Sequence, residues 1–359
     1  MTIEYPIAVS ILASYFVLIA GLTWRVAPDI KHSIKNHSLG VIIFLCLAVV
    51  SFIATWTYMF KFFLHSYMEW KALANYKYDN VSFSLLNSIS YWLHDVSLFD
   101  SAWRQVCVGA WQWLWSHQLC SLTVAVWTPI LAIEGSRRRI PYVWAYMILG
   151  QVVAISVASS LFFAVMLVYP SGFHQNVSKK LLWTLGASTV GGIITVIISP
   201  YVASTSGFMP NLLVMHILLI FPLASKKFIY MPQFGSISTP LIIITLYTFA
   251  AGANLSIYIN QWLTCLATLE VKSGSFICDV YTALIGTFFG HPAQTSISYD
   301  IVCMQVISVA WMLISSKIRD KEIPSWVLGL VLLTPVLSAS VTLPLFFAGC
   351  EYRNVLKND

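Results

Sequence analysis

The residues with the clearest chemical potential lie between Asp95 and Glu134. This stretch contains Asp95, Asp100, one arginine, five tryptophans and one histidine, and Glu134 ends it just before the run Arg137-Arg138-Arg139. A carboxylic acid in apolar surroundings keeps its proton and can donate it to an epoxide or an alkene. Aromatic faces stabilise the resulting cation by about 2 kcal/mol or more when they are desolvated. The composition of the stretch therefore predicts proton-initiated carbocation chemistry.

A single helix over residues 98–118 would place several of these side chains on one face, since successive residues are about 100° apart. They are Asp100, Trp103, Arg104, Trp111, Trp115 and Gln118. We expect this face to form one wall of a cavity, with Asp100 or Asp95 as the acid and the three tryptophans as cation stabilisers. Asp95 and His117 point away from it. The alternative is an Asp100–Arg104 ion pair at the membrane edge above a belt of interfacial tryptophans.

Four further side chains are candidate site residues. Gln151 lies inside an apolar run, where it would contact substrate or, alternatively, form a helix-to-helix hydrogen bond. Asp300 opens another apolar run and shares a helix face with Trp311, although an acid at a helix N-terminus also suits the helix dipole. Glu134 is a further candidate acid, and the alternative is that it pairs with the arginines that follow it. We expect Gln151 and Asp300 to face the wall formed by residues 98–118.

The composition sets the class of protein that must position these groups. Hydrophobic residues make up 58% of the 359 residues and charged residues only 9%, far below the roughly 25% of a soluble domain. The sequence therefore predicts an all-α, polytopic transmembrane helical bundle in a single domain, residues 1–359. The expected spans are 6–23, 39–60, 107–133, 141–169, 181–200, 210–224, 239–259, 300–316 and 324–348. The sixth is short, so eight helices span the bilayer, or nine if the sixth also crosses it.

The basic residues argue for a membrane partner and against nucleic acid. The net charge is +6, but the lysines and arginines occur in small groups beside apolar runs, as interfacial anchors do. The Arg137-Arg138-Arg139 loop should be cytoplasmic by the positive-inside rule, and we expect a multi-pass protein of the endoplasmic reticulum. We predict no metal site and no cofactor, because the seven cysteines form no CxxC pair and the sequence has no DDxxD-type carboxylate cluster.

One part of the chain, from about Trp92 to Leu167, contains runs that together resemble a known family. They are Trp92-x-x-Asp95-x-x-Leu98-Phe99-x-x-Ala102-Trp103, Trp127-Thr128, Glu134-Gly135-x-Arg137-Arg138 and Trp144-Ala145-Tyr146-Met147-x-Leu149-Gly150-Gln151. This segment resembles the fungal integral-membrane terpene cyclases of the ascofuranone and ascochlorin type, which act in meroterpenoid biosynthesis.

The resemblance implies a metal-independent isomerase that protonates an epoxidised, farnesylated aromatic precursor and cyclises the carbocation. Its partners would be that hydrophobic small molecule and the lipid bilayer. No catalytic residue is transferred from the family, so the candidate residues rest on the helix-face argument above. The alternative is a non-enzymatic small-molecule transporter or structural membrane subunit, in which the acids are ion-paired and the aromatic residues line a belt.

Overall fold

The computed structural model describes residues 3–35, 38–77, 84–169, 177–224, 238–271 and 274–358. All regular secondary structure in these ranges is helical, which confirms the all-α prediction. Six segments are long and apolar enough to cross a membrane. They are α1 (Pro6–Ile34), α2 (Leu39–Lys77), the segment Ala110–Arg138, α9 (Lys179–Val202), α11 (Thr239–Ala267) and α13 (Pro292–Asp320). The chain is therefore a multi-pass helical membrane protein, as its composition predicts.

Two of the expected spans are each broken into two helices. Residues 141–169 form α7 (Val143–Val152) and α8 (Ile155–Met166), and residues 324–348 fall in α14 (Ser325–Leu337) and α15 (Ala339–Asn358). The short sixth run forms α10 (Phe208–Ala224), 17 residues long. Broken helices at membrane depth need partners for the freed backbone groups.

The expectation of one continuous helix over residues 98–118 is wrong. The structure has α4 (Leu98–Cys107) and α5 (Ala110–Leu122) instead, and α3 (Leu85–Asp95) precedes them. Gly109 separates α4 from α5 with φ +105°, a conformation that costs little only for glycine. A Cβ atom at this position would also collide with the side chain of Gln112. Asp100 and Trp111 therefore do not share a helix face.

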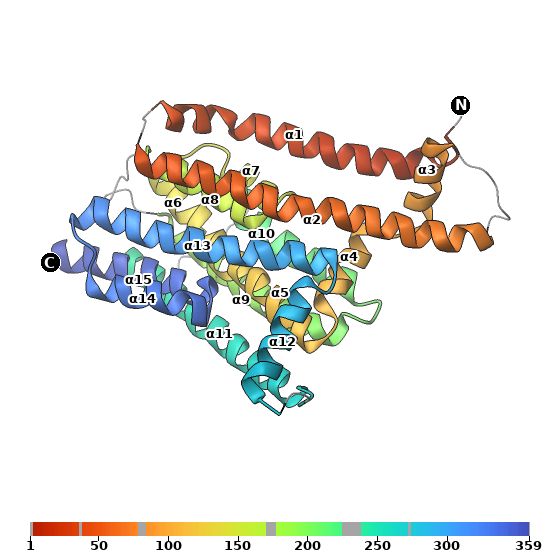
Figure 1. The fold of residues 1–359 in the computed structure, drawn as a ribbon. Coiled ribbons are helices and arrows are strands. Elements are labelled where there is room, and N and C mark those ends of the chain that lie inside the picture. Colours follow the sequence, from red (N-terminus) through yellow and green to blue (C-terminus); the bar gives the residue numbers. More distant parts are fainter. Residues whose placement is uncertain are drawn as a thin grey trace.

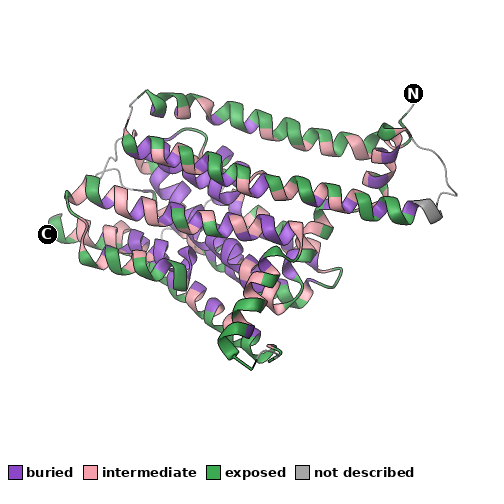
Figure 2. Ribbon diagram, in the orientation of Figure 1, coloured by how far each residue is buried: buried purple, intermediate pink, exposed green. Residues whose placement is uncertain are grey.

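The segment Ala110–Arg138, which we call the pillar, is a buried helical segment in the middle of the bundle. In it, α5 continues through a π-helical turn, Thr123–Trp127, into α6 (Thr128–Arg138). Of its most apolar 18-residue window, 94% is buried inside the protein, against 6% for the window of α1. Figure 2 shows the same contrast, with buried residues in the middle of the bundle and exposed residues along α1. Side chains on the pillar are thus shielded from lipid by neighbouring helices.

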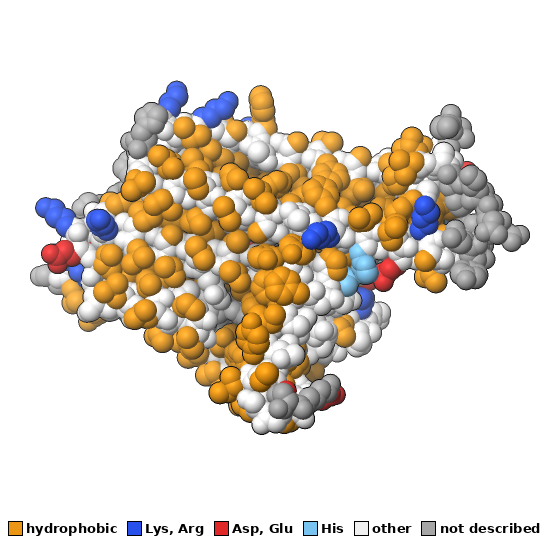
Figure 3. All heavy atoms as spheres, viewed as in Figure 1, with side chains coloured by type: hydrophobic (Ala, Val, Ile, Leu, Met, Phe, Trp, Pro, Cys, Tyr) orange, Lys and Arg blue, Asp and Glu red, His pale blue; other side chains and the backbone are white. Residues whose placement is uncertain are grey.

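The outer surface suits a bilayer. The face seen in Figure 3 is mainly hydrophobic, and its charged side chains lie mostly towards the ends of the long helices. Helix α2 has 39 residues, about 58 Å at 1.5 Å per residue, so it is longer than a hydrocarbon core of about 30 Å. The expected span over residues 39–60 is therefore too short, because the helix continues to Lys77.

The two cavities described below lie at the two ends of the short helix α8. It packs against α2 and α13, which also pack against each other (Figure 1). The remaining described helix, α12 (Phe276–Phe289), contacts α5 and α13. Helix α8 has 12 residues, so its two ends are about 18 Å apart.

Candidate active site

The N-terminal end of α8 is held by Asp300 of α13. Its two carboxylate oxygens accept the backbone N–H groups of Ile155, at 3.1 Å, and Ser156, at 2.8 Å. These amides belong to the first turn of α8, where no backbone carbonyl can accept them. The expectation that Asp300 opens its own helix is wrong, because α13 begins two turns earlier, with Pro292 as its first residue and His291 as its N-cap.

The carbonyl groups left free by the break between α7 and α8 also have side-chain partners. The hydroxyl of Tyr15 on α1 donates to the carbonyl of Val152. The indole N–H of Trp56 on α2 donates to the carbonyl of Val153 at 3.3 Å. Side chains from three other helices thus satisfy the backbone at this break, which makes an irregular segment tolerable at membrane depth.

A cavity of about 190 Å³ opens beside the break, and we call it the Asp300 cavity. Trp103, Gln151 and Asp300 all line it, which confirms the expectation that these three residues belong to the walls of one cavity. The lining is mainly apolar and aromatic, and none of the described residues that form it is Lys or Arg. Its aromatic and polar members include Tyr15, Thr55, Phe62, Phe63, Phe99, Trp103, Thr123, Gln151, His216, Ser296 and Asp300.

Two polar side chains of this cavity have unused hydrogen-bonding capacity. The amide nitrogen of Gln151 is buried and has no hydrogen-bond partner among the described residues. His216 lies 2.7 Å from the carbonyl of Leu212 through its Nδ1 atom. A carbonyl only accepts, so Nδ1 carries the proton, and in the neutral ring Nε2 is an acceptor. The Trp103 ring meets the His216 ring edge to face, with 6.3 Å between their centroids.

A larger hollow of about 910 Å³, which we call the vestibule, has Phe99 in its lining, as the Asp300 cavity does. Asp100 and Arg104 line the vestibule and form an ion pair at 2.8 Å, so the ion-pair alternative is confirmed for them. Arg104 also donates to the carbonyls of Ala203 and Thr205 at 2.7 and 3.0 Å. Asp100 is therefore held beside a cation, outside the Asp300 cavity.

Asp95, the other proposed acid of this stretch, is held by its own neighbours. It accepts the indole N–H of Trp70 at 2.9 Å and contacts Nδ1 of His94 at 3.3 Å. Asp95 is not among the described residues that line the Asp300 cavity or the vestibule. The position of Asp95 outside both hollows gives no support to its proposed role as the acid.

The three predicted site residues on α5 also lie away from the Asp300 cavity. Trp111 packs edge to face against Trp262, and the indole N–H of Trp115 donates to the carbonyl of Leu284 at 3.4 Å. Gln118 donates to the carbonyl of Leu114 at 2.9 Å and lines a hollow of only about 10 Å³. The break at Gly109 turns all three away from Trp103, so the prediction of a shared wall is wrong for them.

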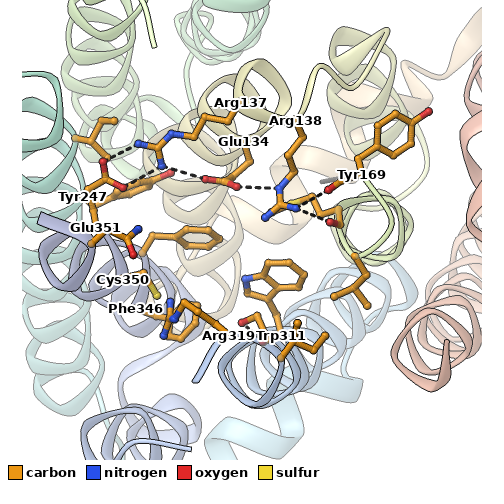
Figure 4. Close-up of a pocket in the computed structure, with 17 residues that line it drawn as sticks. Glu134, Arg137, Arg138, Tyr169, Tyr247, Trp311, Arg319, Phe346, Cys350 and Glu351 are labelled. Atoms are coloured by element: carbon orange, nitrogen blue, oxygen red, sulfur yellow. Dashed lines mark hydrogen bonds and ion pairs between the residues drawn. The ribbon is translucent and has the colours of Figure 1, made fainter. Parts of the chain in front are cut away.

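A second cavity, of about 440 Å³, lies at the C-terminal end of α8 (Figure 4). We call it the arginine cavity. Its charged and aromatic lining residues are Glu134, Arg137, Arg138, Tyr169, Tyr247, Trp311, Arg319, Phe346, Phe347 and Glu351. Within the described ranges, no group of three or more His, Cys, Asp or Glu side chains could hold a metal ion.

The carboxylates of the arginine cavity are ion-paired. Glu134 lies 3.1 Å from Arg138 and 3.5 Å from Arg137, which confirms the alternative that it pairs with the arginines that follow it. Glu351 of α15 accepts two hydrogen bonds from Arg137, at 2.6 and 2.9 Å. Both carboxylates are thus engaged by arginine side chains and hold α6 against α15. The sequence did not suggest Glu351, because its partner is 214 residues away.

The same end of α8 is held by Arg138. Its guanidinium donates to the carbonyls of Met166, at 2.6 Å, and Tyr169, at 2.8 Å, which lie at and just beyond the end of the helix. Trp311 of α13 stacks on Phe163 of α8 with 4.5 Å between ring centroids. Asp300 and Trp311 thus both contact α8, which confirms that they share one face of α13.

Comparisons with known proteins match only the C-terminal part of the chain. A family model described as "Protein of unknown function DUF2834" matches residues 246–351. This region includes Asp300 and Trp311 but does not overlap residues 92–167. No significant match was found among curated proteins or among solved structures.

Proposed function

We propose that the chain is a membrane terpene cyclase of the endoplasmic reticulum, and that the Asp300 cavity is its reaction site. Its substrate would be an epoxidised, farnesylated aromatic precursor of a meroterpenoid. The observation that supports the proposal most directly is the placement of Asp300, a buried carboxyl group that faces an apolar, aromatic cavity with no Lys or Arg among its described lining residues. Asp95, Asp100 and Glu134 each lie outside this cavity, and the last two are ion-paired.

The proposed reaction is an isomerisation. Protonated Asp300 gives its proton to the epoxide oxygen while the bond from that oxygen to the more substituted carbon breaks. The unpartnered amide nitrogen of Gln151 donates a hydrogen bond to the same oxygen. An alkene of the prenyl chain supplies the electron pair for the new C–C bond, and the final cation loses a proton to Nε2 of His216. Asp300 and His216 then exchange protons with water, so no other reactant is consumed.

Aromatic rings of the cavity would stabilise the intermediate cations. Trp103 offers the largest ring in the lining, and tryptophan gives the strongest cation–π attraction. Phe62, Phe63 and Phe99 add further ring faces. None of these rings is a good nucleophile, so they can stabilise a carbocation without capturing it.

The dimensions favour a substrate that extends through both hollows. At about 190 Å³, the Asp300 cavity is smaller than the roughly 300–1,000 Å³ typical of pockets for drug-sized ligands. It suits the epoxide end of a prenyl chain. The vestibule, at about 910 Å³, would hold the aromatic end beside Asp100 and Arg104. Phe99 lines both hollows and would contact the chain between them.

The experiment uses membranes that contain the full-length protein and a farnesylated hydroxybenzoate with a terminal epoxide. We expect a cyclised product of unchanged mass. Asp300→Asn should lower the rate by about 10²–10⁴-fold, the usual contribution of general acid catalysis. The control is Asp95→Asn, which removes an acid outside both hollows and should keep wild-type activity. The cyclase proposal fails if wild-type membranes leave the epoxide unchanged. The assignment of Asp300 as the acid fails if Asp300→Asn is as active as the wild type.

A small-molecule transporter remains the competing function, and the break between α7 and α8 favours it. Transporters often bind their substrates where discontinuous helices meet near the middle of the membrane. Proteoliposomes with the purified protein distinguish the two functions. A transporter would accumulate the intact epoxide inside the vesicles, whereas a cyclase would yield the isomer on either side without a gradient.

A further inference from the structure

The arginine cavity carries an excess of positive charge that the proposed reaction does not use. Three arginines and two glutamates line it. Directly beside it, Asp320 is shared by Arg319, Arg353 and Lys357, at 2.9, 2.9 and 3.5 Å. In these described groups, five cationic side chains thus accompany three carboxylates. The cavity and its surroundings therefore favour an anion.

Two neutral donors in the lining are buried and have no hydrogen-bond partner among the described residues. They are the indole N–H of Trp311 and the hydroxyl of Tyr247. Only 4% of Trp311 and 1% of Tyr247 is exposed, so neither group is satisfied by bulk water. Buried polar groups normally have a partner, and a donor without one costs about 1–3 kcal/mol. An oxygen-rich ligand would satisfy both groups.

The rest of the lining is apolar. Leu167, Ile243, Ile318, Phe346 and Phe347 line the same cavity as the arginines. Figure 4 shows Trp311 in the middle of the group, with Arg137, Arg138 and Arg319 around it. Polar donors and an apolar lining in one cavity of about 440 Å³ suit an amphiphile, a molecule with a charged head and a hydrocarbon chain.

We propose that the arginine cavity binds the phosphate group of an anionic amphiphile. Arg319, Trp311 and Tyr247 would donate to the phosphate oxygens, and Ile318 and Phe346 would contact the hydrocarbon chain. Basic pockets between transmembrane helices bind anionic lipid headgroups in this way on the cytoplasmic side. This site lies at the opposite end of α8 from Asp300, so a lipid bound here would contact the C-terminal end of the helix whose N-terminal end Asp300 holds.

The test measures binding of dodecyl phosphate to the full-length protein in a neutral detergent. We expect saturable binding, and no comparable binding of dodecyltrimethylammonium. Trp311→Phe and Tyr247→Phe each remove one donor, and neither donor has a hydrogen-bond partner among the described residues. Each should weaken binding by about 10-fold, the cost of one hydrogen bond to a charged group. Arg319→Gln should weaken binding by at least as much.

The matched control is Trp127→Phe. The indole N–H of Trp127 is also buried without a partner in the described part of the chain, but Trp127 is not among the lining residues of the arginine cavity. Its affinity for dodecyl phosphate should equal that of the wild type. The proposal is overturned if Trp311→Phe and Tyr247→Phe bind like the wild type, if Trp127→Phe weakens binding equally, or if the cationic detergent binds as well.

Two competition arms identify the source of the phosphate. In nanodiscs, displacement of dodecyl phosphate by phosphatidic acid, but not by phosphatidylcholine, would assign the site to a membrane lipid. Displacement by inorganic phosphate alone would assign it to a soluble phosphate. Displacement by neither would overturn the proposal. No epoxide is present in these assays, so their result is independent of the cyclase test.

Discussion

At its first residues α8 receives a carboxylate from α13, and near its last residues it receives a guanidinium from α6. Both groups suit the helix dipole, because the carboxyl oxygens of Asp300 accept hydrogen bonds at its positive N-terminal end and the guanidinium of Arg138 donates at its negative C-terminal end. The two ends differ in what surrounds these groups. Arg138 belongs to a network of ion pairs with Glu134, Arg137 and Glu351, whereas Asp300 has no Lys or Arg among the described residues of its cavity.

Under the proposed function, this difference separates a structural use of a charged group from a chemical one. At the arginine cavity, the charges tie α6 to α15 and hold the end of α8. At the Asp300 cavity, the carboxyl group holds a helix end but keeps an apolar environment on its other side. A cation beside Asp300 would be compatible with a role as a helix cap alone, so its absence from the described lining favours a second role for this carboxyl group. Substitutions at the arginine end should therefore mainly affect stability, whereas substitutions of Asp300 should mainly affect catalysis.

The largest expected effect on stability is at the Arg137–Glu351 pair. Glu351→Gln leaves Arg137 facing Glu134 alone, and removing one partner of a buried ion pair costs about 3–5 kcal/mol. We expect a lower free energy of unfolding for the full-length protein in detergent, measured by denaturant titration. The double variant Arg137→Met/Glu351→Met removes both charges and should recover much of this loss, since apolar replacements of buried pairs are often neutral. A single variant as stable as the wild type would contradict the structural role of the pair.

The two roles of Asp300 can be separated by comparing two substitutions. Asp300→Ala removes both acceptors for the amides of α8 and should cost about 0.5–2 kcal/mol of stability, as the loss of an N-cap does. Asp300→Asn keeps one acceptor oxygen and should cost less, because asparagine caps helices well. Cyclisation should be lost in both variants, since neither has a proton to donate. If Asp300→Asn retains activity and Asp300→Ala loses it, Asp300 acts only as a helix cap.

The sequence predicted the class of fold and several local pairs. Apolar periodicity and charge placement indicated the long helices, and the i,i+4 spacing of Asp100 and Arg104 indicated their ion pair. The shared face of Asp300 and Trp311 was also correct, because α13 has no break between them. These features depend on residues close together in one helix, where the spacing alone determines the geometry.

Features that depend on breaks or on distant partners could not be predicted in this way. The positive φ of Gly109 turns Trp111 away from Asp100, but a glycine within an apolar run does not itself reveal a break. The roles of Tyr15 and Glu351 depend on partners 137 and 214 residues away. The position of His216 beside Trp103 depends on how α10 and α4, which are far apart in the sequence, are placed relative to each other.

Gln151 tests whether an unused donor serves the substrate. Gln151→Leu removes a buried amide nitrogen that has no partner in the described part of the chain, so stability should be unchanged or slightly higher. If the amide donates to the epoxide oxygen, the rate of cyclisation should fall about 5-fold, the value of about 1 kcal/mol for one neutral hydrogen bond. The rate is measured with saturating epoxide, and the melting temperature of the same variant is measured to show whether its stability has changed. An unchanged rate would exclude this contact, and a lower rate with lower stability would indicate a structural role instead.

The smallest effect is expected from two tryptophans that one continuous helix would have placed together. Trp103→Phe keeps an aromatic face in the Asp300 cavity but offers the cation a weaker quadrupole, so cyclisation should slow about 2- to 5-fold, or roughly 0.5–1 kcal/mol. Trp111→Phe is the matched control, because Trp111 packs against Trp262 beyond the break at Gly109. It should leave the rate unchanged. If both variants slow cyclisation equally, the cation is not confined to the Asp300 cavity, and the contrast between the two ends of α8 would no longer locate the chemistry.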